Sequence, residues 1–452
     1  VVPLLVAFIS ILAKKVAPYL LLIVSFASVV VLYFVDKETI IIGGFSAPYG
    51  ISLVVDNFSV AGLYIVNVLF FLVVSITIKN YKNLSSILLV SLAGLNGLLL
   101  TGDLFNLFVF LEISGIAAYL ITTTNKKPLA TFNYLVLGTV GSSFYLLGLI
   151  ILYNMFGTLN MVDLNTAIGS SGVSLGLVSL PFLFMFIGLG VEAKLLPFNS
   201  WVKGILSNSN KLSGTMIAAV YAAAIGLVFG RLLVQVFAFD ATLTLIISAI
   251  LIFSIAAGEA MAYASTKAKE ILLFSSIAQA GVAVLVFFSG FIGWGLVLIG
   301  VNAFTKFVLF IIINHASEEV GSDELDSLEG LFVENKLIGV AFTISSLSVI
   351  GLPLFAGFVV KMRILTNFFG NSQFLFPAVI LITSIVEGVY FIKLLIKLWY
   401  KDGETVPNVS FDIVIKYVVI VIALLVTVFG IFNADLVDLA SSITANVLGG
   451  IL

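Results

Sequence analysis

Long apolar runs of about 20 residues alternate along the chain with short polar or turn-forming breaks. A helix of that length crosses the hydrocarbon core of a bilayer, whereas the strands of a membrane β-barrel are shorter and alternate in polarity. The pattern therefore predicts an all-α integral membrane protein with about 14 transmembrane helices. The first run lacks the basic start and cleavage site of a signal peptide, so we expect a helix there too. The expected spans are residues 1–13, 16–35, 58–78, 83–101, 103–123, 129–155, 175–195, 212–236, 242–262, 268–289, 292–314, 337–365, 374–400 and 412–432.

Composition supports this class and excludes several others. The 452 residues are 61% hydrophobic and only 10% charged, with a mean hydropathy of +1.25; globular domains carry about 25% charged residues. The net charge of −2 argues against a nucleic-acid partner. With no cysteine and one histidine, His315, the sequence offers no disulfide, thiolate-held cluster or multi-histidine metal site. No Walker loop or dinucleotide fingerprint is present either, so we expect no cofactor in this chain.

The distribution of lysine predicts the orientation. Loops after odd-numbered predicted spans carry lysine, whereas loops after even-numbered spans carry Asp163 or Asp240 and little positive charge. Because cytoplasmic loops are enriched in Lys and Arg, both termini are expected on the outer side of the membrane. The lysines concerned are Lys14, Lys15, Lys79, Lys82, Lys126, Lys127, Lys203, Lys211, Lys267, Lys269, Lys397 and Lys401.

One loop on the lysine-rich side is acidic, which does not change the orientation because acidic residues weigh little in topology. Two interpretations of this loop are open: a docking surface for a partner protein, and a solvated loop, which is the more frequent case. Its acidic residues are Glu318, Glu319, Asp323, Glu324, Asp326, Glu329 and Glu334.

Charged residues lie deep inside four predicted spans, at Glu112, Lys194, Lys306 and Lys361. A charged side chain at the bilayer centre costs roughly 2.5–3.5 kcal/mol on insertion scales, so such residues are usually functional. Acid and base together predict a path for protons or small cations. The alternatives are a static ion pair that fixes helix packing for Glu112, and a lysine that extends to the interface for Lys361, which has Arg363 close by.

Two of these spans combine the lysine with a proline. Lys194 precedes Pro197 in the seventh span, and Pro353 precedes Lys361 in the twelfth. Proline removes a backbone hydrogen bond, which a bilayer tolerates only where protein or water satisfies the freed groups. Interrupted helices at matching positions of two repeats mark the ion sites of many transporters. The five-span separation thus predicts an internal repeat, with simple structural kinks as the alternative.

Five stretches carry specific motifs. They are 43–51 with Asp56, 101–112, 269–281, 303–310 and 351–361. Together they resemble the D-type membrane component of Mrp-type cation/proton antiporters, and they are also similar to the antiporter-like subunits of respiratory complex I and of membrane-bound hydrogenase and sulfur reductase complexes. The resemblance covers essentially the whole chain. Its motifs distinguish poorly among these relatives, although the overall length and the segment 43–51 favour the D-type and its hydrogenase-side relatives.

The resemblance implies two inverted five-helix repeats, each with one broken helix. Glu112 corresponds to the family's fifth-span glutamate, Lys306 to its eleventh-span lysine and Lys361 to the terminal residue of its twelfth span. The implied mechanism is proton passage along a central hydrated axis, gated by Glu–Lys pairing such as a two-state contact of Glu112 with Lys194. The expected domains are 1–101 for the N-terminal spans, 83–236 and 242–400 for the two repeats, and 412–452 for the last span and tail.

Two departures from the family pattern bear on this mechanism. The family's span-seven lysine stands five residues before the proline; here Glu192 holds that register and Lys194 stands three residues before Pro197. Because residues two apart point to different sides of a regular helix, we favour Lys194 for the relay and keep Glu192 as a second candidate. The family's span-eight lysine is replaced by Ala223, with only Tyr221 nearby. A relay between the halves would then need water, or the chain conducts poorly.

Other polar residues are weaker candidates. Glu387 lies inside the thirteenth span and is a further candidate for the pathway, whereas Asp103 opens the fifth span and suits a helix cap equally well. His315, at the end of the eleventh span, is expected at the interface. Lys267 and Lys269 are expected as cytoplasmic anchors.

The leading functional interpretation is an ion-translocating subunit that works inside a larger membrane complex. Its partners are expected to be other membrane subunits, and the ion is H+ alone or H+ exchanged for Na+. Any oxidoreductase or hydrogenase chemistry would belong to other chains. Two alternatives stay open: a scaffold that keeps the fold without conducting, and a stand-alone secondary transporter, against which the lack of a midplane arginine or polar cluster argues.

Overall fold

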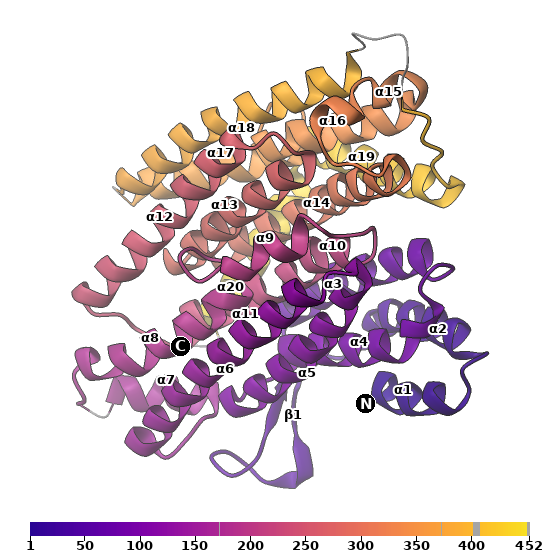
Figure 1. The fold of residues 1–452 in the computed structure, drawn as a ribbon. Coiled ribbons are helices and arrows are strands. Elements are labelled where there is room, and N and C mark those ends of the chain that lie inside the picture. The colour runs from indigo at the N-terminus through magenta and orange to yellow at the C-terminus, as the bar shows by residue number, and fades with distance from the viewer. Residues whose placement is uncertain (171, 372, 401–406, 450–452) are drawn as a thin grey trace.

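The computed structural model describes residues 1–170, 172–371, 373–400 and 407–449, which form a bundle of roughly parallel and antiparallel helices (Figure 1). Its helices are α1 (Val2–Leu12), α2 (Ala17–Val31), α3 (Asn57–Thr77), α4 (Ser85–Leu100), α5 (Leu104–Thr122), α6 (Pro128–Phe156), α7 (Met161–Ser170), α8 (Leu175–Glu192), α9 (Ser200–Leu206), α10 (Ser213–Thr215), α11 (Ala222–Gln235), α12 (Ala241–Ala264), α13 (Ala268–Phe288), α14 (Ile292–Val320), α15 (Leu331–Glu334), α16 (Lys336–Ile350), α17 (Ala356–Gly370), α18 (Leu375–Trp399), α19 (Ile413–Ile431) and α20 (Ala434–Gly449).

Shorter elements complete the fold. A π-helix, η5 (Met216–Tyr221), joins α10 to α11 without a break. Two short strands, β1 (Thr39–Ile41) and β2 (Ser52–Val54), pair antiparallel between α2 and α3. The single-turn 3-10 helices are η1 (Leu32–Phe34), η2 (Ile42–Gly44), η3 (Lys82–Leu84), η4 (Thr123–Asn125) and η6 (Leu325–Leu328). Two parts of the sequence expectations, Lys401 and residues 450–452, lie outside the described residues.

The all-α membrane fold predicted from the apolar runs is confirmed. Among the described residues, 12 helical segments are long and apolar enough to cross a bilayer, or 13 if Leu325–Glu334 and α16, which meet at a bend of 116°, form one span. These 12 match 12 of the predicted spans. The other two differ from simple spans: α1 has only 11 residues, fewer than a crossing needs, and the span expected at 337–365 is divided into α16 and α17.

Three segments near the middle of the chain form the centre of the bundle. They are Ser213–Gln235, α13 and α14, whose apolar windows are 89%, 83% and 78% buried, against 33% for the outer helix α6. In Figure 1 they lie between the helices of the first half, below, and those of the second half, above. Polar side chains on these three segments are therefore shielded from lipid.

Both halves contain the predicted broken helix. In the first half α8 ends at Glu192, Lys194 adopts a left-handed φ of 66°, and α9 begins at Ser200. In the second half α16 ends before Gly351 (φ 85°), and α17 starts two residues after Leu354 (φ 82°). The proline in each segment prevents a continuous helix. The repeat boundaries at 83–236 and 242–400 stay a prediction.

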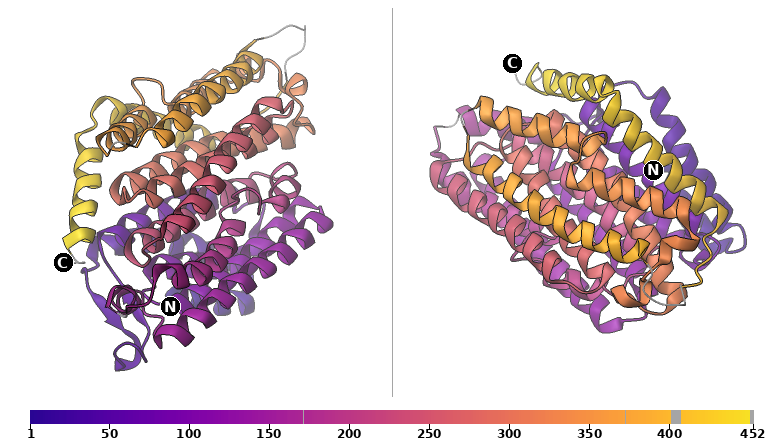
Figure 2. Two further views of the ribbon diagram at one scale, coloured as in Figure 1. Left: turned by 90° about the vertical axis from the view of Figure 1, so that its left-hand side faces the viewer. Right: turned by 90° about the horizontal axis from the view of Figure 1, so that it is seen from above.

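The helices outside the predicted spans include α7 and α20. Both carry more polar residues than a span, so the hydropathy pattern places them in loops. Figure 2 shows α20 on the outside of the bundle, running across the direction of the neighbouring helices. It packs closely on the start of α14. The contact is so close that a side chain at Gly293 would clash with the Ala440 carbonyl oxygen. Residues 434–449 therefore form a helix that packs on the bundle.

An ion pair ties the N-terminal spans to the centre of the bundle. Asp56 caps α3 by accepting a hydrogen bond from the Ser59 N–H at 2.7 Å, and it also accepts one from Arg231 Nη2 of α11 at 3.0 Å. The arginine side chain is 6% exposed and lies 5.5 Å from the ring centre of Phe58. Burial acts to raise the pKa of Asp56, but the charge of Arg231 and the Ser59 hydrogen bonds outweigh it and hold this pKa below its ordinary value.

Replacing Arg231 with Gln is expected to lower the stability of the purified protein by roughly 1.5–3 kcal/mol, the range for hydrogen bonds to charged groups. Thermal unfolding in detergent measures this, and the exposed Arg363→Gln is the matched control, expected to change little. Because the pKa of Asp56 is lowered by folding, the contribution is present at neutral pH and is lost as the pH falls below the ordinary value of 3.8. Equal wild-type and Arg231→Gln stability at pH 7 would show that the pair contributes nothing.

Candidate functional site

Charged side chains inside the bundle form two clusters with one lysine between them. The first cluster surrounds Glu192 in the first half, and the second surrounds Glu387 in the second half. Lys306 of α14 lies between them. Each of these residues was a candidate from the sequence, and the structure shows which of them lie together.

In the first cluster, two tyrosines hold the Glu192 carboxylate at the end of α8. The hydroxyl of Tyr119 donates to Oε1 and that of Tyr134 donates to Oε2, each at 3.4 Å. Tyr134 stacks on Trp201 of α9, with ring centres 3.8 Å apart, and the Trp201 indole N–H donates to the Val191 carbonyl. Both contacts to Glu192 are longer than an ordinary O–H···O hydrogen bond. The carboxylate is thus loosely held and free to exchange partners.

The expected contact of Glu112 with Lys194 is not formed in this structure. Lys194 is 1% exposed and donates to Ser276 Oγ of α13 at 2.9 Å. Glu112 is half-buried on α5 and instead lies near enough to Glu192 and Tyr119 to act on them electrostatically. The Glu112 side chain forms no hydrogen bond or ion pair with any described residue. The acid of the first half therefore faces a second acid.

The end of α8 explains this arrangement. The sequence expectation treated Glu192 and Lys194 as residues of one regular helix, of which only one can face the interior. The helix stops at Glu192, and the left-handed turn at Lys194 sends its side chain to α13 while Glu192 contacts α5 and α6. Both side chains are therefore directed into the bundle, and both remain candidates.

In the second cluster, Lys361 and Glu387 form a buried ion pair. Lys361 Nζ donates to Glu387 Oε2 at 2.7 Å, and also to the Ile350 carbonyl at 2.9 Å and to Ser384 Oγ at 3.2 Å. Gln279 Nε2 donates to Glu387 Oε1 at 2.7 Å. The side chains of the pair are 13% and 1% exposed. Lys361 therefore points inward and does not extend to the membrane interface, the alternative left open by the sequence.

Lys306 is buried without a partner. It is 6% exposed, and among the described residues no hydrogen bond or ion pair of its ammonium group is formed. Lys194, Glu387 and Glu259 act on it electrostatically. One turn earlier on the same face of α14, Asn302 donates to Gln279 Oε1 at 3.2 Å, which links α14 to the second cluster. Lys306 therefore has two acids of the second half, Glu387 and Glu259, and Lys194 of the first half within electrostatic reach.

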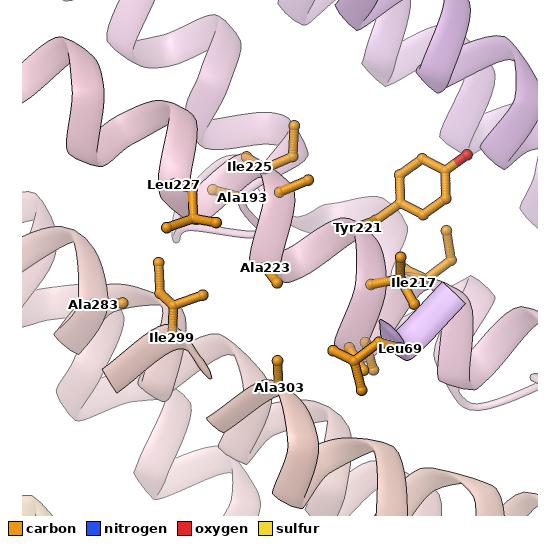
Figure 3. Packing of buried hydrophobic residues seen from close by; sticks show 14 of the residues in the cluster. Leu69, Ala193, Ile217, Tyr221, Ala223, Ile225, Leu227, Ala283, Ile299 and Ala303 are labelled. Carbon is orange, nitrogen blue, oxygen red and sulfur yellow. The ribbon is translucent and has the colours of Figure 1, made fainter. Parts of the chain in front are cut away.

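A cavity of about 40 Å³ lies beside Lys306. It is lined by Lys306, by Ser276, which is the partner of Lys194, and by Ala223, where the related proteins are expected to carry a lysine. Figure 3 shows the Ala223 methyl group directed toward Ala303 of α14, with Tyr221 pointing to the other side of its helix. A water needs roughly 10–15 Å³ of such volume, so the cavity beside Ala223 has room for about three waters.

Glu259 is a buried acid that the sequence analysis missed. It lies on α12, is 3% exposed, and its Oε2 atom has no hydrogen-bond partner in the described part of the chain. It acts electrostatically on Glu387, Lys361 and Lys306. The signal that would have found it is the one that pointed to Glu387: a carboxylate inside an apolar run.

Within the described part of the chain, the weaker candidates make local structural contacts. Asp103 caps α5 by accepting from the Asn106 N–H at 2.8 Å. His315 Nε2 contacts the Ser410 carbonyl at 2.9 Å. Lys269 differs from the expected surface anchor: it is 8% exposed and donates to the Ser209 carbonyl at 2.7 Å.

Several side chains of the acidic loop pair with lysines of this same chain. Lys267 lies 3.7 Å from Asp323 and 3.3 Å from Glu324. On the other side of the loop, Lys397 contacts Asp326 at 3.0 Å and Glu329 at 3.4 Å. Exposed pairs of this kind contribute little to stability, but they partly neutralise the loop. These contacts favour the solvated-loop interpretation over a docking surface.

The chain is similar to membrane subunits of several known complexes. Residues 101–386 match the family described as NADH:quinone oxidoreductase/Mrp antiporter, TM. The chain is 32% identical over 375 residues to the N-type subunit of the NADH-quinone oxidoreductase of Desulforudis audaxviator (strain MP104C), covering 78% of this chain and 74% of that one. It is 27% identical to the D-type subunit of the Na(+)/H(+) antiporter of Bacillus subtilis (strain 168), covering 82% and 78%.

Solved structures show the same fold. A chain of the membrane-bound sulfane sulfur reductase, an archaeal respiratory membrane complex, superimposes with a TM-score of 0.90 at 26% identity over 98% of this chain and 96% of that one. A chain of the Mrp complex from Dietzia sp. DQ12-45-1b gives a TM-score of 0.88 at 20% identity over 99% and 96%, which supports the fold alone.

Substituting Gly138 with Ala tests the packing around Glu192. The new Cβ would overlap the Tyr119 hydroxyl oxygen and lie 3.2 Å from Glu192 Oε1, so the tyrosine must move away. Overpacking of this kind costs about 1–3 kcal/mol, measured as a lower midpoint of thermal unfolding. Adding Tyr119→Phe should recover part of the loss because it removes the clashing oxygen. Gly169→Ala, which has open space around the new atom, is the control; an equal effect there would contradict the assignment.

Proposed function

The chain belongs to the NADH:quinone oxidoreductase/Mrp antiporter family, which confirms the resemblance carried by its motifs, and we propose that it moves protons across the membrane through its own core. Its relatives and structural neighbours are antiporter-like membrane subunits of larger complexes. It is accordingly an antiporter-like, multi-pass membrane subunit. We further propose that its partners are other membrane subunits and that it resides in a prokaryotic plasma membrane.

The observation that carries the proposal is the unpaired, buried Lys306 between two acid-containing clusters. A low-dielectric environment disfavours the charged form of an amine, while a carboxylate within reach favours it. A lysine with no fixed partner therefore gains or loses its proton according to where the neighbouring acids stand. A lysine locked in a permanent ion pair would not respond in this way.

The proposed route follows the polar side chains across the bundle. In the first half, the route begins at the carboxylates of Glu112 and Glu192 and continues to the amine of Lys194. Ser276 and water in the cavity beside Ala223 carry the proton on to Lys306. Water takes the place that a lysine side chain would otherwise fill.

From Lys306 the route continues into the second cluster. Glu387 pairs with Lys361 and, through Gln279 and Asn302, is joined to the helix of Lys306. A proton that arrives on Lys306 attracts Glu387 and weakens its pairing with Lys361, which is then free to release its own proton. Glu387 would thus pair either with Lys361 or with Lys306, and these two alternative pairings provide the switch that gated transport requires.

One observation favours a second candidate, a scaffold that keeps the fold without conducting. The cavity beside Ala223 has no titratable side chain except Lys306 itself. If water does not fill it, the two halves are not connected. The following two variants separate these possibilities.

Lys306→Ala is expected to abolish proton flux, lowering it by at least about tenfold, because the proposed link between the clusters is lost. The measurement is the internal pH of proteoliposomes containing the purified complex, driven by a potassium diffusion potential. Lys336→Ala removes an exposed lysine and is the control. Wild-type flux in an assembled Lys306→Ala complex would reject the relay; no flux in the wild type as well would favour the scaffold.

Ala223→Val is expected to slow proton flux by roughly tenfold or more, since two added methyl groups displace water from a cavity of this size. Ala223→Ser, which is small and polar, should retain flux. Both variants are compared in the proteoliposome assay with assembly checked by size-exclusion chromatography. If valine and serine at this position conduct alike, water in this cavity is not the link.

The type of complex is open to a direct experiment. Gentle purification from the native membrane, followed by mass spectrometry and metal analysis, identifies what accompanies the chain. Hydrophilic redox subunits and iron would place it in a respiratory or hydrogenase-like complex. Small membrane subunits without iron would place it in an Mrp-type antiporter, in which H+ is exchanged for Na+.

A further inference from the structure

Three buried oxygen atoms without hydrogen-bond partners lie together beside the second cluster. They are Glu259 Oε2 on α12, Ser275 Oγ on α13 and the Tyr390 hydroxyl on α18. The residues are 3%, 2% and 2% exposed. Most buried polar atoms in folded proteins have a partner, so three unsatisfied oxygens in one place require an explanation.

The helix packing brings these oxygens to one spot. α12 packs against both α13 and α18, and the Tyr390 hydroxyl lies next to both the Glu259 carboxylate and the Ser275 hydroxyl, although neither contact has the geometry of a hydrogen bond. Ser275 stands one turn before Gln279, and Tyr390 stands three residues after Glu387, so both share a helix face with the second cluster. The three oxygens therefore adjoin the Gln279–Glu387 pair.

The charges around Glu259 favour a cation. The charge of the neighbouring Glu387 is already neutralised by Lys361 at 2.7 Å. The remaining positive group that acts on Glu259 is Lys306, which forms no ion pair among the described residues. When Lys306 has given up its proton, the Glu259 carboxylate is a buried charge without compensation. Burying such a charge is costly, so the carboxylate takes up either a proton or a cation.

The ligand set suits a monovalent cation better than a transition metal or a divalent ion. All three atoms are hard oxygen donors, and only one belongs to a carboxylate, so the set carries at most one negative charge, which a monovalent cation balances. Within the described residues no group of three or more His, Cys, Asp or Glu side chains is placed to hold a metal ion. A tyrosine hydroxyl, a serine hydroxyl and one carboxylate match the charge of an ion such as Na+.

We propose that Glu259, Ser275 and Tyr390 form a binding site for a small monovalent cation, at which the cation and the proton of Lys306 exclude each other. This inference rests on the proposed function and deepens it by locating the second ion. Two positive charges within reach in a low-dielectric core repel strongly. Binding of the cation therefore drives the proton off Lys306, and reprotonation drives the cation out. By linkage, each ion lowers the affinity of the other by the same factor.

The test is Na+ binding to the purified complex in detergent, measured by equilibrium dialysis with radioactive sodium in choline buffer. The wild type should bind Na+ saturably, more weakly at lower pH, and should release protons when NaCl but not choline chloride is added. Glu259→Gln is expected to weaken Na+ binding by at least about tenfold, and Tyr390→Phe, which removes only the oxygen, by several fold. The Tyr390 variant keeps the test valid if Glu259→Gln fails to assemble.

The matched control is Ser345→Ala on α16. Ser345 also has a buried hydroxyl without a partner, but it lies outside the proposed site, so its variant should bind Na+ like the wild type. Absence of saturable Na+ binding in the wild type, or equal binding by Glu259→Gln and Ser345→Ala, would overturn the site. Proton flux in sodium-free proteoliposomes is the separate readout for the proposed function: its presence with no Na+ binding rejects the site alone.

Discussion

The dominant constraint on this chain is the free energy of placing charged groups in a medium that cannot solvate them. In lipid, each charge and each free backbone group needs a partner inside the protein. The chain meets this requirement by directing its intramembrane charges into the bundle, from the enclosed helices, from the two helix breaks and from the inner faces of outer helices. Lys306 and Glu387 are each at most 6% exposed, so their environment is set by the protein and not by water or lipid.

The two helix breaks determine which neighbours these charged side chains can reach. A continuous α8 would fix Glu192 and Lys194 on different sides of one helix, whereas ending the helix at Glu192 lets each side chain reach a different neighbour. The second break has a comparable effect, because ending α16 at Ile350 exposes its last carbonyl, which accepts a hydrogen bond from Lys361. Irregular backbone deep in the bundle is therefore a source of ligands and of alternative geometry, at a depth where lipid would not tolerate it.

The two halves of the bundle differ in how tightly their buried carboxylates are held. Glu387 has two hydrogen bonds of 2.7 Å, while both contacts of Glu192 are 3.4 Å long. In addition, Lys306 has no fixed partner among the described residues, and the cavity beside Ala223 has space for water. An arrangement of one firm pair, one loose acid and one free base can rest in more than one charge state. A cation near Glu259 would add a further state to the same network.

The sequence by itself determined the class of the protein, 12 of its spans, both helix breaks and most of its intramembrane charges. These features follow from local quantities: the length of an apolar run, a proline within it, and the cost of an isolated charge in lipid. Only the tertiary structure decided which charges meet. It paired Lys361 with Glu387, placed Glu112 beside Glu192 and away from Lys194, and gathered Glu259, Ser275 and Tyr390 from three helices. Hydropathy has no term for the rotation of a uniformly apolar helix about its axis, because nearly all of its faces look alike; packing against the neighbouring helices sets that rotation, and with it the partner of every buried charge.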